Sequence, residues 1–443
     1  MQQEFSLSWV QSQVSESVDL WNLSALPSTL NGPTYTRKTQ NEREQACDEA
    51  LQTVERELIN VHLSKEGRLE TQNRIITTLA LFSQSALGLN KEAANLLTYD
   101  FLNAGTHFSR LARQFDPTLS MANITQACRS AWTACGLQML LGDPIEITPA
   151  ILGYSLLYPY SDNFLDSTNV RAEDKVRFSK RFRKRLVGCG PATLNPRETA
   201  LWALVDLIEA QFPRTRYPQV YDCLLAIHHA QEASIGQLGD CPDCNGSELL
   251  RITCAKGGSS VLADACLAHG SLSQTESRFS FDWGVLLQLG DDLQDVSEDL
   301  ARGSHTLFTR AVHAKIPLDA IVLQLLNFSE RVAARMDSLP GASKMIKDLL
   351  TMSWRSLIVG AVAESHELFS PEFLVNVERL SPFRFDFLRV RHKKLANRQG
   401  LYSNLFEALT ETGEINEASS LHACNLLHRQ AGLKSAPSFV IAG

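Results

Sequence analysis

The sequence places two aspartates, Asp162 and Asp166, four residues apart in a segment rich in apolar and aromatic residues. On a helix, side chains at this spacing project from one face, so the two carboxylates can share a ligand. Like charges on one helix face repel each other, and an unpaired carboxylate among apolar side chains is poorly tolerated. The pair therefore indicates a cation site, and a solvated helix face is the alternative reading of this pair alone.

A second acidic group lies in the segment 290–299, directly after the apolar run 285–289. On a helix it forms a stripe of Asp291, Asp295 and Asp299, which repeat at four-residue steps, with Asp292 at its border. Hard oxygen ligands without His or Cys favour magnesium over zinc. Because magnesium commonly binds one or two carboxylates together with phosphate oxygens, two facing acidic helices predict several ions around a diphosphate.

Between the two aspartate groups, the sequence offers side chains for a diphosphate. Gln237 lies in Gly-Gln-Leu-Gly-Asp at 236–240, and Lys256, five residues after Arg251, precedes the adjacent glycines Gly257 and Gly258. Two glycines inside a helical pattern cost about 1 kcal/mol each relative to alanine. We therefore expect a helix break that exposes backbone N–H groups to an anion, with Lys256 as a point charge for phosphate. A plain loop with Lys256 in solvent is the alternative.

The order of these segments resembles the isoprenoid synthase superfamily, which includes trans-prenyltransferases, squalene and phytoene synthases, and class I terpene cyclases. The resemblance spans roughly residues 70–400 and rests on Asp162-x-x-x-Asp166, Gly236-Gln237-x-x-Asp240, the Lys256 segment and Gly290-Asp291-Asp292-Leu293-Gln294-Asp295. It implies an all-α, isoprenoid synthase-type helical bundle around a central apolar cavity. At the mouth of that cavity, two acidic helices would bind three magnesium ions.

Carried over residue by residue, the resemblance also implies roles for the acidic and polar side chains. Asp162 and Asp166 would form the first metal site and take part in catalysis. The second metal site would be formed by Asp291 and Asp295, with Asp292 and Asp299 as further ligands. Gln237, Arg251 or Lys256 would contact the diphosphate.

The chain also departs from part of the family pattern. Chain-elongating prenyltransferases carry paired aspartates at the start of the first motif and an arginine pair after it. This chain has Asp162-Asn163 and no adjacent arginine pair just downstream. The resemblance therefore implies a class I terpene synthase that ionises a linear C15–C25 isoprenyl diphosphate with Mg²⁺ and yields a hydrocarbon or alcohol. A chain-joining enzyme, similar to squalene or phytoene synthases or to trans-prenyltransferases, is the alternative.

Three residues are candidates to contact the hydrocarbon part of such a substrate. Phe281 and Gln288 lie on the same helical face as Asp292, and Tyr158 lies one turn before the first aspartate pair. Aromatic faces can stabilise cations. Core packing is an equally good reading of these side chains.

The elements that must position these residues are helices. From about residue 41, apolar residues recur at three- and four-residue steps, and convincing period-2 strands are absent. Breakers such as Gly142-Asp143-Pro144 separate about twelve to fifteen predicted helices. We predict an N-terminal arm or cover at 1–40, an all-helical catalytic domain at 41–400 and a helical C-terminal tail at 401–443.

Composition limits the classes of function. The net charge of −7 argues against nucleic-acid binding, because the phosphate backbone requires a basic face. The N-terminus lacks the signal-peptide pattern and no apolar run is long enough to span a membrane, so a cytoplasmic location without membrane insertion is expected. The expected partner is the isoprenyl diphosphate substrate, and the oligomeric state, with a homodimer among the options, stays open.

A different class of protein also stays open. Most of the 10 cysteines are scattered along the chain and are expected to be free thiols. Cys241 and Cys244, with Cys254 and Cys266, could nevertheless bind zinc and staple a non-catalytic helical interaction protein. The second pair is twelve residues apart, which is not a usual zinc-ligand spacing.

Overall fold

The computed structural model describes residues 6–25, 32–59, 65–167, 169–234 and 245–396, and the regular elements in these ranges are all helices. The prediction of an all-helical chain is confirmed. The described ranges hold eighteen α-helices, more than predicted, because four of them are only five to eight residues long and show no periodicity in the sequence. No helix in these ranges combines the length and apolar character that crossing a membrane requires. The predicted C-terminal tail, 401–443, lies outside them.

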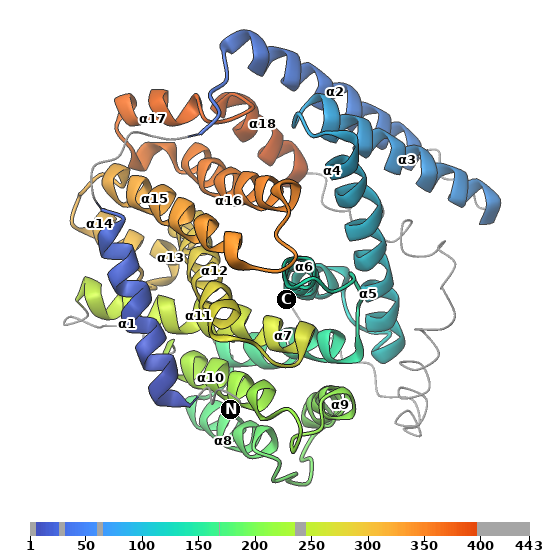
Figure 1. Cartoon of the computed structure of the whole chain (residues 1–443), viewed down its shortest axis with the longest axis vertical. Coiled ribbons are helices and arrows are strands. Elements are labelled where there is room, and N and C mark those ends of the chain that lie inside the picture. Colours follow the sequence, from blue (N-terminus) through green and yellow to red (C-terminus); the bar gives the residue numbers. More distant parts are fainter. Residues whose placement is uncertain (1–5, 26–31, 60–64, 168, 235–244, 397–443) are drawn as a thin grey trace.

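Figure 1 shows the course of the chain through the bundle. The helices are α1 (Leu7–Leu23), α2 (Arg37–Ile59), α3 (Lys65–Ser85), α4 (Lys91–Asn95), α5 (Phe101–Phe115), α6 (Met121–Leu141), α7 (Pro149–Asp166), α8 (Ala172–Leu186), α9 (Pro196–Gln211), α10 (Pro218–Ser234), α11 (Gly246–His269), α12 (Gln274–Gln294), α13 (Val296–Arg302), α14 (Leu307–His313), α15 (Asp319–Arg335), α16 (Lys344–Glu364), α17 (Pro371–Glu378) and α18 (Phe385–Ala396).

Local sequence signals explain where the central helices begin and end. At the start of α12, the side chain of Ser273 accepts a hydrogen bond from the backbone N–H of Glu276. The side chain of Glu276 in turn accepts one from the backbone N–H of Ser273, which completes a capping box. Thr148 caps α7 with Pro149 in the first turn. The predicted break at 142–144 ends α6, where Gly142 adopts the left-handed conformation (φ +84°) that favours glycine.

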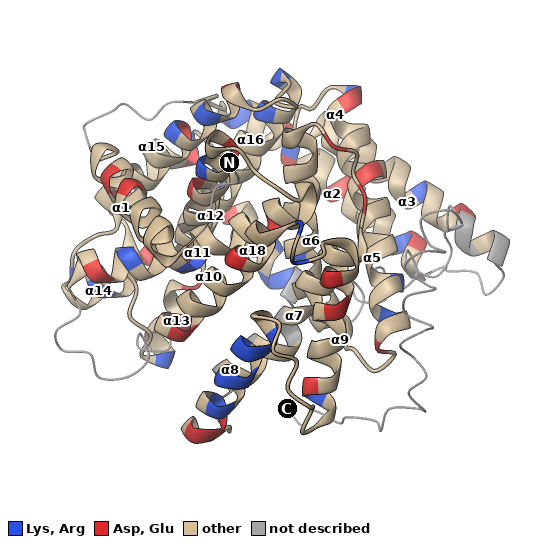
Figure 2. Ribbon diagram, turned by 60° about the horizontal axis from the view of Figure 1, so that its bottom comes forward, with Lys and Arg blue, Asp and Glu red and all other residues tan. Residues whose placement is uncertain are grey.

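The antiparallel pair of α11 and α12 forms the centre of the bundle. Helices α6, α7 and α10 pack against α11, whereas α15 and α16 pack against α12. One large apolar core runs through these helices, and α2 and α3 form a small separate cluster around Val54, Leu58 and Ile75. Lys and Arg residues, coloured blue on the ribbon, are frequent on α8 at the edge of the molecule in Figure 2.

Helices α11 and α12 contact each other backbone to backbone. A Cβ atom on Gly284 of α12 would overlap the carbonyl group of Gly257, and one on Gly258 would overlap the ring of Phe281. Only glycine permits this separation, because any larger residue would push the two helices apart. The three glycines therefore set the distance between the two central helices.

The predicted N-terminal arm contains α1, which covers α11 and α15. Val10, Val14 and Trp21 of α1 are buried in the main apolar core. The backbone carbonyl of Trp21 accepts a hydrogen bond of 2.8 Å from Gln324 Nε2 of α15. Residues 7–23 are thus an integral part of the bundle.

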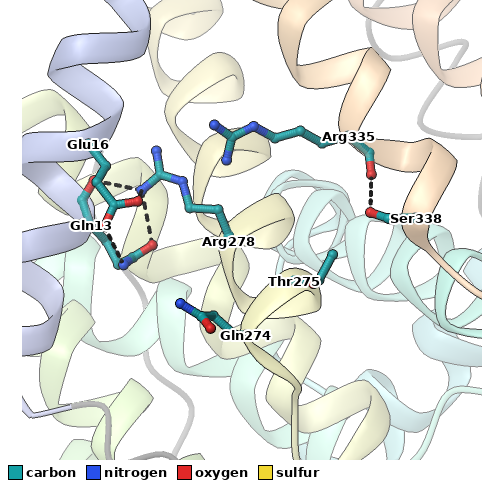
Figure 3. Close-up of a pocket in the computed structure, with 7 residues that line it drawn as sticks. All are labelled: Gln13, Glu16, Gln274, Thr275, Arg278, Arg335 and Ser338. Atoms are coloured by element: carbon teal, nitrogen blue, oxygen red, sulfur yellow. Dashed lines mark hydrogen bonds and ion pairs between the residues drawn. The ribbon is translucent and has the colours of Figure 1, made fainter.

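A buried charge cluster fastens α1 to α12 and α15. Asp282 of α12, which is fully buried, accepts a 2.8 Å hydrogen bond from Ser17 Oγ and lies 2.6 Å from guanidinium nitrogens of both Arg278 and Arg335. Figure 3 shows Arg278 and Arg335 at a polar cavity of about 250 Å³ beside α1, where Arg278 also contacts Gln13. The charges of this cluster pair with each other, so its evident role is structural.

We expect Gly284→Ala to lower the free energy of unfolding by about 1–3 kcal/mol, because the new methyl group overlaps the Gly257 carbonyl and forces the two helices apart. Urea denaturation followed by circular dichroism measures the change. The matched control is Gly360→Ala in α16, where no atom lies within 4 Å of the new Cβ; this substitution should stabilise the helix by about 0.5–1 kcal/mol. Equal effects at both positions would contradict the proposed close contact.

Candidate active site

A cavity of about 260 Å³ lies beside α11 and α12 and is bordered by α6, α7, α8 and α10. Its charged and amide side chains come from α6, α10, α11 and α12 and include Arg129, Lys256, Gln288 and Asp291. Most of the remaining wall is apolar and contains Leu157, Phe182, Leu186, Leu224, Ile227, Val261 and Leu287. A concave, largely apolar site with a few convergent polar groups is the usual form of a small-molecule site.

The close contact of α11 and α12 brings predicted site residues from distant segments to one wall. Lys256 precedes Gly257 on α11, and Gln288 lies one turn after Gly284 on α12; both line the cavity with Asp291. Asp291 is also 2.9 Å from Arg129 Nη2 of α6. Because the Arg129 side chain is 66% exposed, this ion pair contributes little to stability and can be exchanged for another ligand at low cost.

Asp292 faces away from the solvent and into the contact between the two helices. Its carboxylate accepts hydrogen bonds of 2.9 Å from Gln288 Nε2 and 3.2 Å from Thr253 Oγ1. Burial raises the pKa of Asp292 to about 7, even though Gln288 and Lys256 act to lower it. Both carboxylate oxygens thus have protein partners, and Asp292 links α12 to α11.

The acidic stripe continues across the end of α12. The backbone N–H of Asp295 donates to the Asp291 carbonyl (2.9 Å), and that of Asp299 donates to the Asp295 carbonyl (2.8 Å), so the four-residue repeat is kept into α13. Partial burial, together with the carboxylates of Asp291, Glu298 and Asp299, raises the pKa of Asp295 to about 6. Burial also raises the pKa of Asp299. These carboxylates repel one another, and a bound cation would relieve the repulsion.

The donor set of the stripe suits magnesium. Within the described part of the chain, no three His, Cys, Asp or Glu side chains are grouped closely enough to hold a metal ion by themselves. Magnesium, however, retains waters and needs only one or two carboxylates when phosphate oxygens complete its shell. Asp291, Asp295 and Asp299 supply only hard oxygen atoms and are the residues that would hold such an ion.

The first predicted metal site lies near the end of α7. Asp162 and Asp166 are in its last two turns, but their side chains and that of Tyr158 lie outside what the structure describes. The same helix lines the cavity through Tyr154, Leu157 and Ser161. The helix that carries the first aspartate pair therefore borders the same cavity as Asp291.

The other predicted substrate contacts are not among the described residues that line the cavity. Gln237 falls in 235–244, outside the described residues. Arg251 is on the side of α11 that faces α1, with Nη1 3.4 Å from Ser15 Oγ, and is not among the residues that line the cavity. Phe281 does not line it either: its ring is fully buried against Gly258 and meets the ring of Trp9 edge-on at 6.5 Å. The contacts of Phe281 are those of core packing, the alternative reading.

The predicted helix break at Gly257 and Gly258 is wrong. Helix α11 runs without interruption from Gly246 to His269, so its backbone N–H groups at the glycines stay within the helix. The glycines instead make room for α12, as their contacts with Gly284 and Phe281 show. Lys256 still lines the cavity, but without a helix N-terminus beside it.

The proposed zinc staple is not supported by the positions of Cys254 and Cys266. Both are buried on the single helix α11, and twelve residues correspond to about 18 Å along its axis. One tetrahedral zinc ion with ligands at about 2.3 Å cannot bind both. Cys266 Sγ instead lies 3.2 Å from Cys223 Sγ, and Cys241 and Cys244 lie outside the described residues.

The lining residues that were not identified from the sequence include Arg129, His228 and Asp264. Asp264 is buried and accepts a 2.9 Å hydrogen bond from Ser130 Oγ, and burial raises its pKa well above the usual range. An aspartate inside the apolar run 261–267 was a usable sequence signal. Arg129 and His228 carry no such signal, because their roles depend on partners from distant helices.

The raised pKa of Asp292 predicts a pH dependence of stability in metal-free protein. The folded state keeps this proton up to about pH 7, whereas an unfolded aspartate loses it near pH 4. The stability from this group is therefore fully present below about pH 4 and is lost as the pH rises through about 7. Between pH 5 and pH 8 in EDTA, wild type should lose more unfolding free energy than Asp292→Asn, by on the order of a few kcal/mol.

Urea denaturation at several pH values measures this difference. The control is Asp348→Asn on α16, an exposed acidic residue that pairs with Lys344, which should follow the wild-type pH dependence. Parallel pH curves for wild type and Asp292→Asn would show that the Asp292 proton does not affect folding.

Comparisons with known proteins give no match to this chain among family models, curated proteins or solved structures. The chemical role of the cavity therefore rests on its residues and geometry.

Proposed function

We propose that the chain is a magnesium-dependent class I terpene synthase that ionises a linear isoprenyl diphosphate. One observation carries this proposal: the polar side chains of Lys256, Gln288 and Asp291 line a cavity whose remaining wall is largely apolar. Such a cavity can hold a diphosphate at its polar side and a hydrocarbon chain against the rest. The helix that carries Asp162 and Asp166 borders the same cavity.

The residues of the polar side favour departure of the diphosphate. Lys256 supplies a positive charge, and Arg129 supplies a second one when it exchanges its carboxylate partner for the substrate. Asp291, Asp295 and Asp299, together with the aspartates of α7, are the residues that would hold magnesium, and magnesium bound there would supply charge neutralisation for the leaving group. The charge that develops on the diphosphate is thus met by fixed cations in a partly water-excluded site.

The apolar wall protects the allylic cation left by ionisation. Leu157, Leu224, Ile227 and Leu287 hold no nucleophile and exclude water from the reacting carbon. Phe182 and Tyr154 line the same wall, and aromatic faces attract cations. The shape of this wall would then decide how the chain folds and which product forms.

The size of the cavity favours a substrate at or below the short end of the C15–C25 range. A dry cavity of about 150 Å³ accommodates the six carbons of benzene. At that ratio, 260 Å³ accommodates roughly ten carbons, which is nearer to one C15 chain than to C25 or to two chains side by side. The volume thus supports a synthase that acts on one substrate over a chain-joining enzyme.

We expect purified protein with Mg²⁺ to convert one of the C10, C15, C20 or C25 isoprenyl diphosphates into a hydrocarbon or alcohol with an unchanged carbon number. Mass spectrometry of the products and a phosphate assay for released diphosphate test this. Products of doubled or extended carbon number would assign a chain-joining enzyme. Release of no diphosphate from any of the four would remove the proposed function.

We expect Asp291→Asn to reduce turnover by about 100-fold or more, because it removes a charged metal ligand from the polar side of the cavity. Excess EDTA should abolish turnover of wild type. Asp348→Asn is the matched control, since this acidic side chain is exposed, pairs with Lys344 outside the cavity lining and should leave turnover close to that of wild type. Full activity of Asp291→Asn, with folding verified by circular dichroism, would contradict the role of the acidic stripe.

A further inference from the structure

Helix α8 has two unlike faces. Its inner face is buried and contributes Phe182 and Leu186 to the wall of the cavity. Its other face is exposed, and the exposed residues recur at three- and four-residue steps, which places them along one side of the helix. We call this exposed side the outer stripe of α8. It consists of Val176, Arg177, Lys180, Arg183, Lys184 and Val187 at the end of the helix.

The outer stripe is strongly cationic, although the whole chain carries a net charge of −7. Helix α8 holds seven Lys or Arg residues and two acidic residues. On its inner side, Arg181 and Arg185 pair with acidic residues of α9. Lys180, Arg183 and Lys184 are exposed and have no ion-pair partner among the described residues. Their charges are therefore available to an anionic partner outside the protein.

The acidic residues of α8 do not cancel this charge. Both lie in the first turn of the helix. Asp174 pairs with Arg171 and Arg177, and Glu173 lies at the helix N-terminus, where a negative charge is favourable. The three unpaired cations follow one to three turns later along the helix, so the positive charge is concentrated in its second half.

Two exposed valines lie on either side of these cations. Val176 is 52% exposed and Val187 is 48% exposed, and eleven residues of helix separate them by about 16 Å. Helices that lie on a lipid surface combine Lys and Arg with aliphatic side chains, because the cations meet lipid phosphates and the aliphatic groups reach toward the acyl chains. A soluble phosphate ion would use only the cations, whereas an anionic bilayer offers partners for both kinds of side chain.

The position of α8 makes the outer stripe accessible to a flat surface. The helix packs against α9 and α10 and lies at the edge of the molecule, with its basic residues visible in Figure 2. Its fifteen residues form a rod about 22 Å long. A planar bilayer can therefore contact the length of the stripe while the rest of the bundle stays in water.

We propose that the outer stripe of α8 binds the surface of an anionic phospholipid bilayer, without crossing it. This binding does not depend on the proposed function. If that function holds, the binding has a further consequence, because Phe182 and Leu186 line the cavity from the opposite side of the same helix. The bilayer then lies about one helix diameter, about 10 Å, from the cavity, and apolar substrate tails and products can exchange with lipid over a short path.

The test uses the full chain, without substrate, and vesicles of phosphatidylcholine with and without phosphatidylserine. We expect sedimentation with the vesicles only when phosphatidylserine is present, and loss of this binding at high salt, which screens exposed charges. A triple variant, Lys180→Gln with Arg183→Gln and Lys184→Gln, should bind these vesicles about 100-fold more weakly, because each cation near an anionic surface contributes about fivefold.

Two further variants separate local from overall effects. Lys38→Gln, Lys91→Gln and Lys344→Gln together remove the same charge from exposed lysines of α2, α4 and α16, and this control should bind vesicles nearly as well as wild type. Val176→Ser with Val187→Ser keeps all the cations and should weaken binding by several-fold, since apolar area leaves the lipid. Circular dichroism verifies that each variant is folded.

Several outcomes would overturn the inference. Wild type that does not bind vesicles with phosphatidylserine, or that binds phosphatidylcholine alone equally well, excludes an anionic bilayer as the partner. Equal loss of binding in the α8 variant and the lysine control would assign the effect to overall charge. If α8 retains a polyglutamate peptide but no vesicles, the partner is an acidic protein. Because no assay here contains an isoprenyl diphosphate, these results leave the terpene synthase proposal untouched, and a lack of turnover leaves lipid binding untouched.

Discussion

The site depends on the backbone contact between α11 and α12. Gly257 and Gly258 face Gly284 and Phe281 at a separation that leaves no space for a Cβ atom on any of the three glycines. At this separation Gln288 can line the same cavity as Lys256, and Thr253 can reach across to the carboxylate of Asp292. A wider spacing would break the hydrogen bond to Asp292 and leave a buried carboxylate with fewer partners, which is costly. Packing of small residues in one place therefore sets the charge pattern of the cavity wall.

The aspartates at the centre of this bundle differ in how their carboxyl groups are satisfied, and the difference separates structural from reactive positions. Asp282 lies between two arginines and Ser17, so its charge is paired within the protein. This cluster holds α1 against the bundle. Asp292 is held by Gln288 and Thr253. Asp295 differs from both, because its surroundings include three further carboxylates, and its pKa rises to about 6. The carboxylates of this acidic segment repel one another beside an apolar cavity, so a bound cation would stabilise them. The carboxylates of Asp282 and Asp292 already have protein partners and do not require a cation.

The sequence was sufficient for the fold class and for the acidic stripe, because a 3.6-residue period and a four-residue aspartate repeat are local properties. It was insufficient where the meaning of a residue depends on a distant partner. Two adjacent glycines in a helical pattern fit either a break or a close helix contact, and only Gly284, on another helix, decides for the contact. His228 was missed for the same reason, since its contact with Ser179 of α8 forms only after α8 and α10 pack together. The short helices such as α13 have too few residues to show a period.

On the proposed function, the charge state of the cavity matters as much as its shape. A carbocation is attracted to any ionised carboxylate, and at 4 Å this attraction is about 4 kcal/mol for an effective dielectric constant of about 20. An ionised Asp264 in the wall would therefore hold the cation in one place and compete with the folding of the chain. Burial raises the pKa of Asp264 well above its usual range, which favours the neutral carboxyl, and burial lowers the pKa of His228, which favours the neutral ring. The formal charges of the described lining residues are then confined to Arg129, Lys256 and Asp291, where the diphosphate would bind. The apolar part of the cavity thus presents dipoles and aromatic faces to the cation and no fixed charge that would trap it.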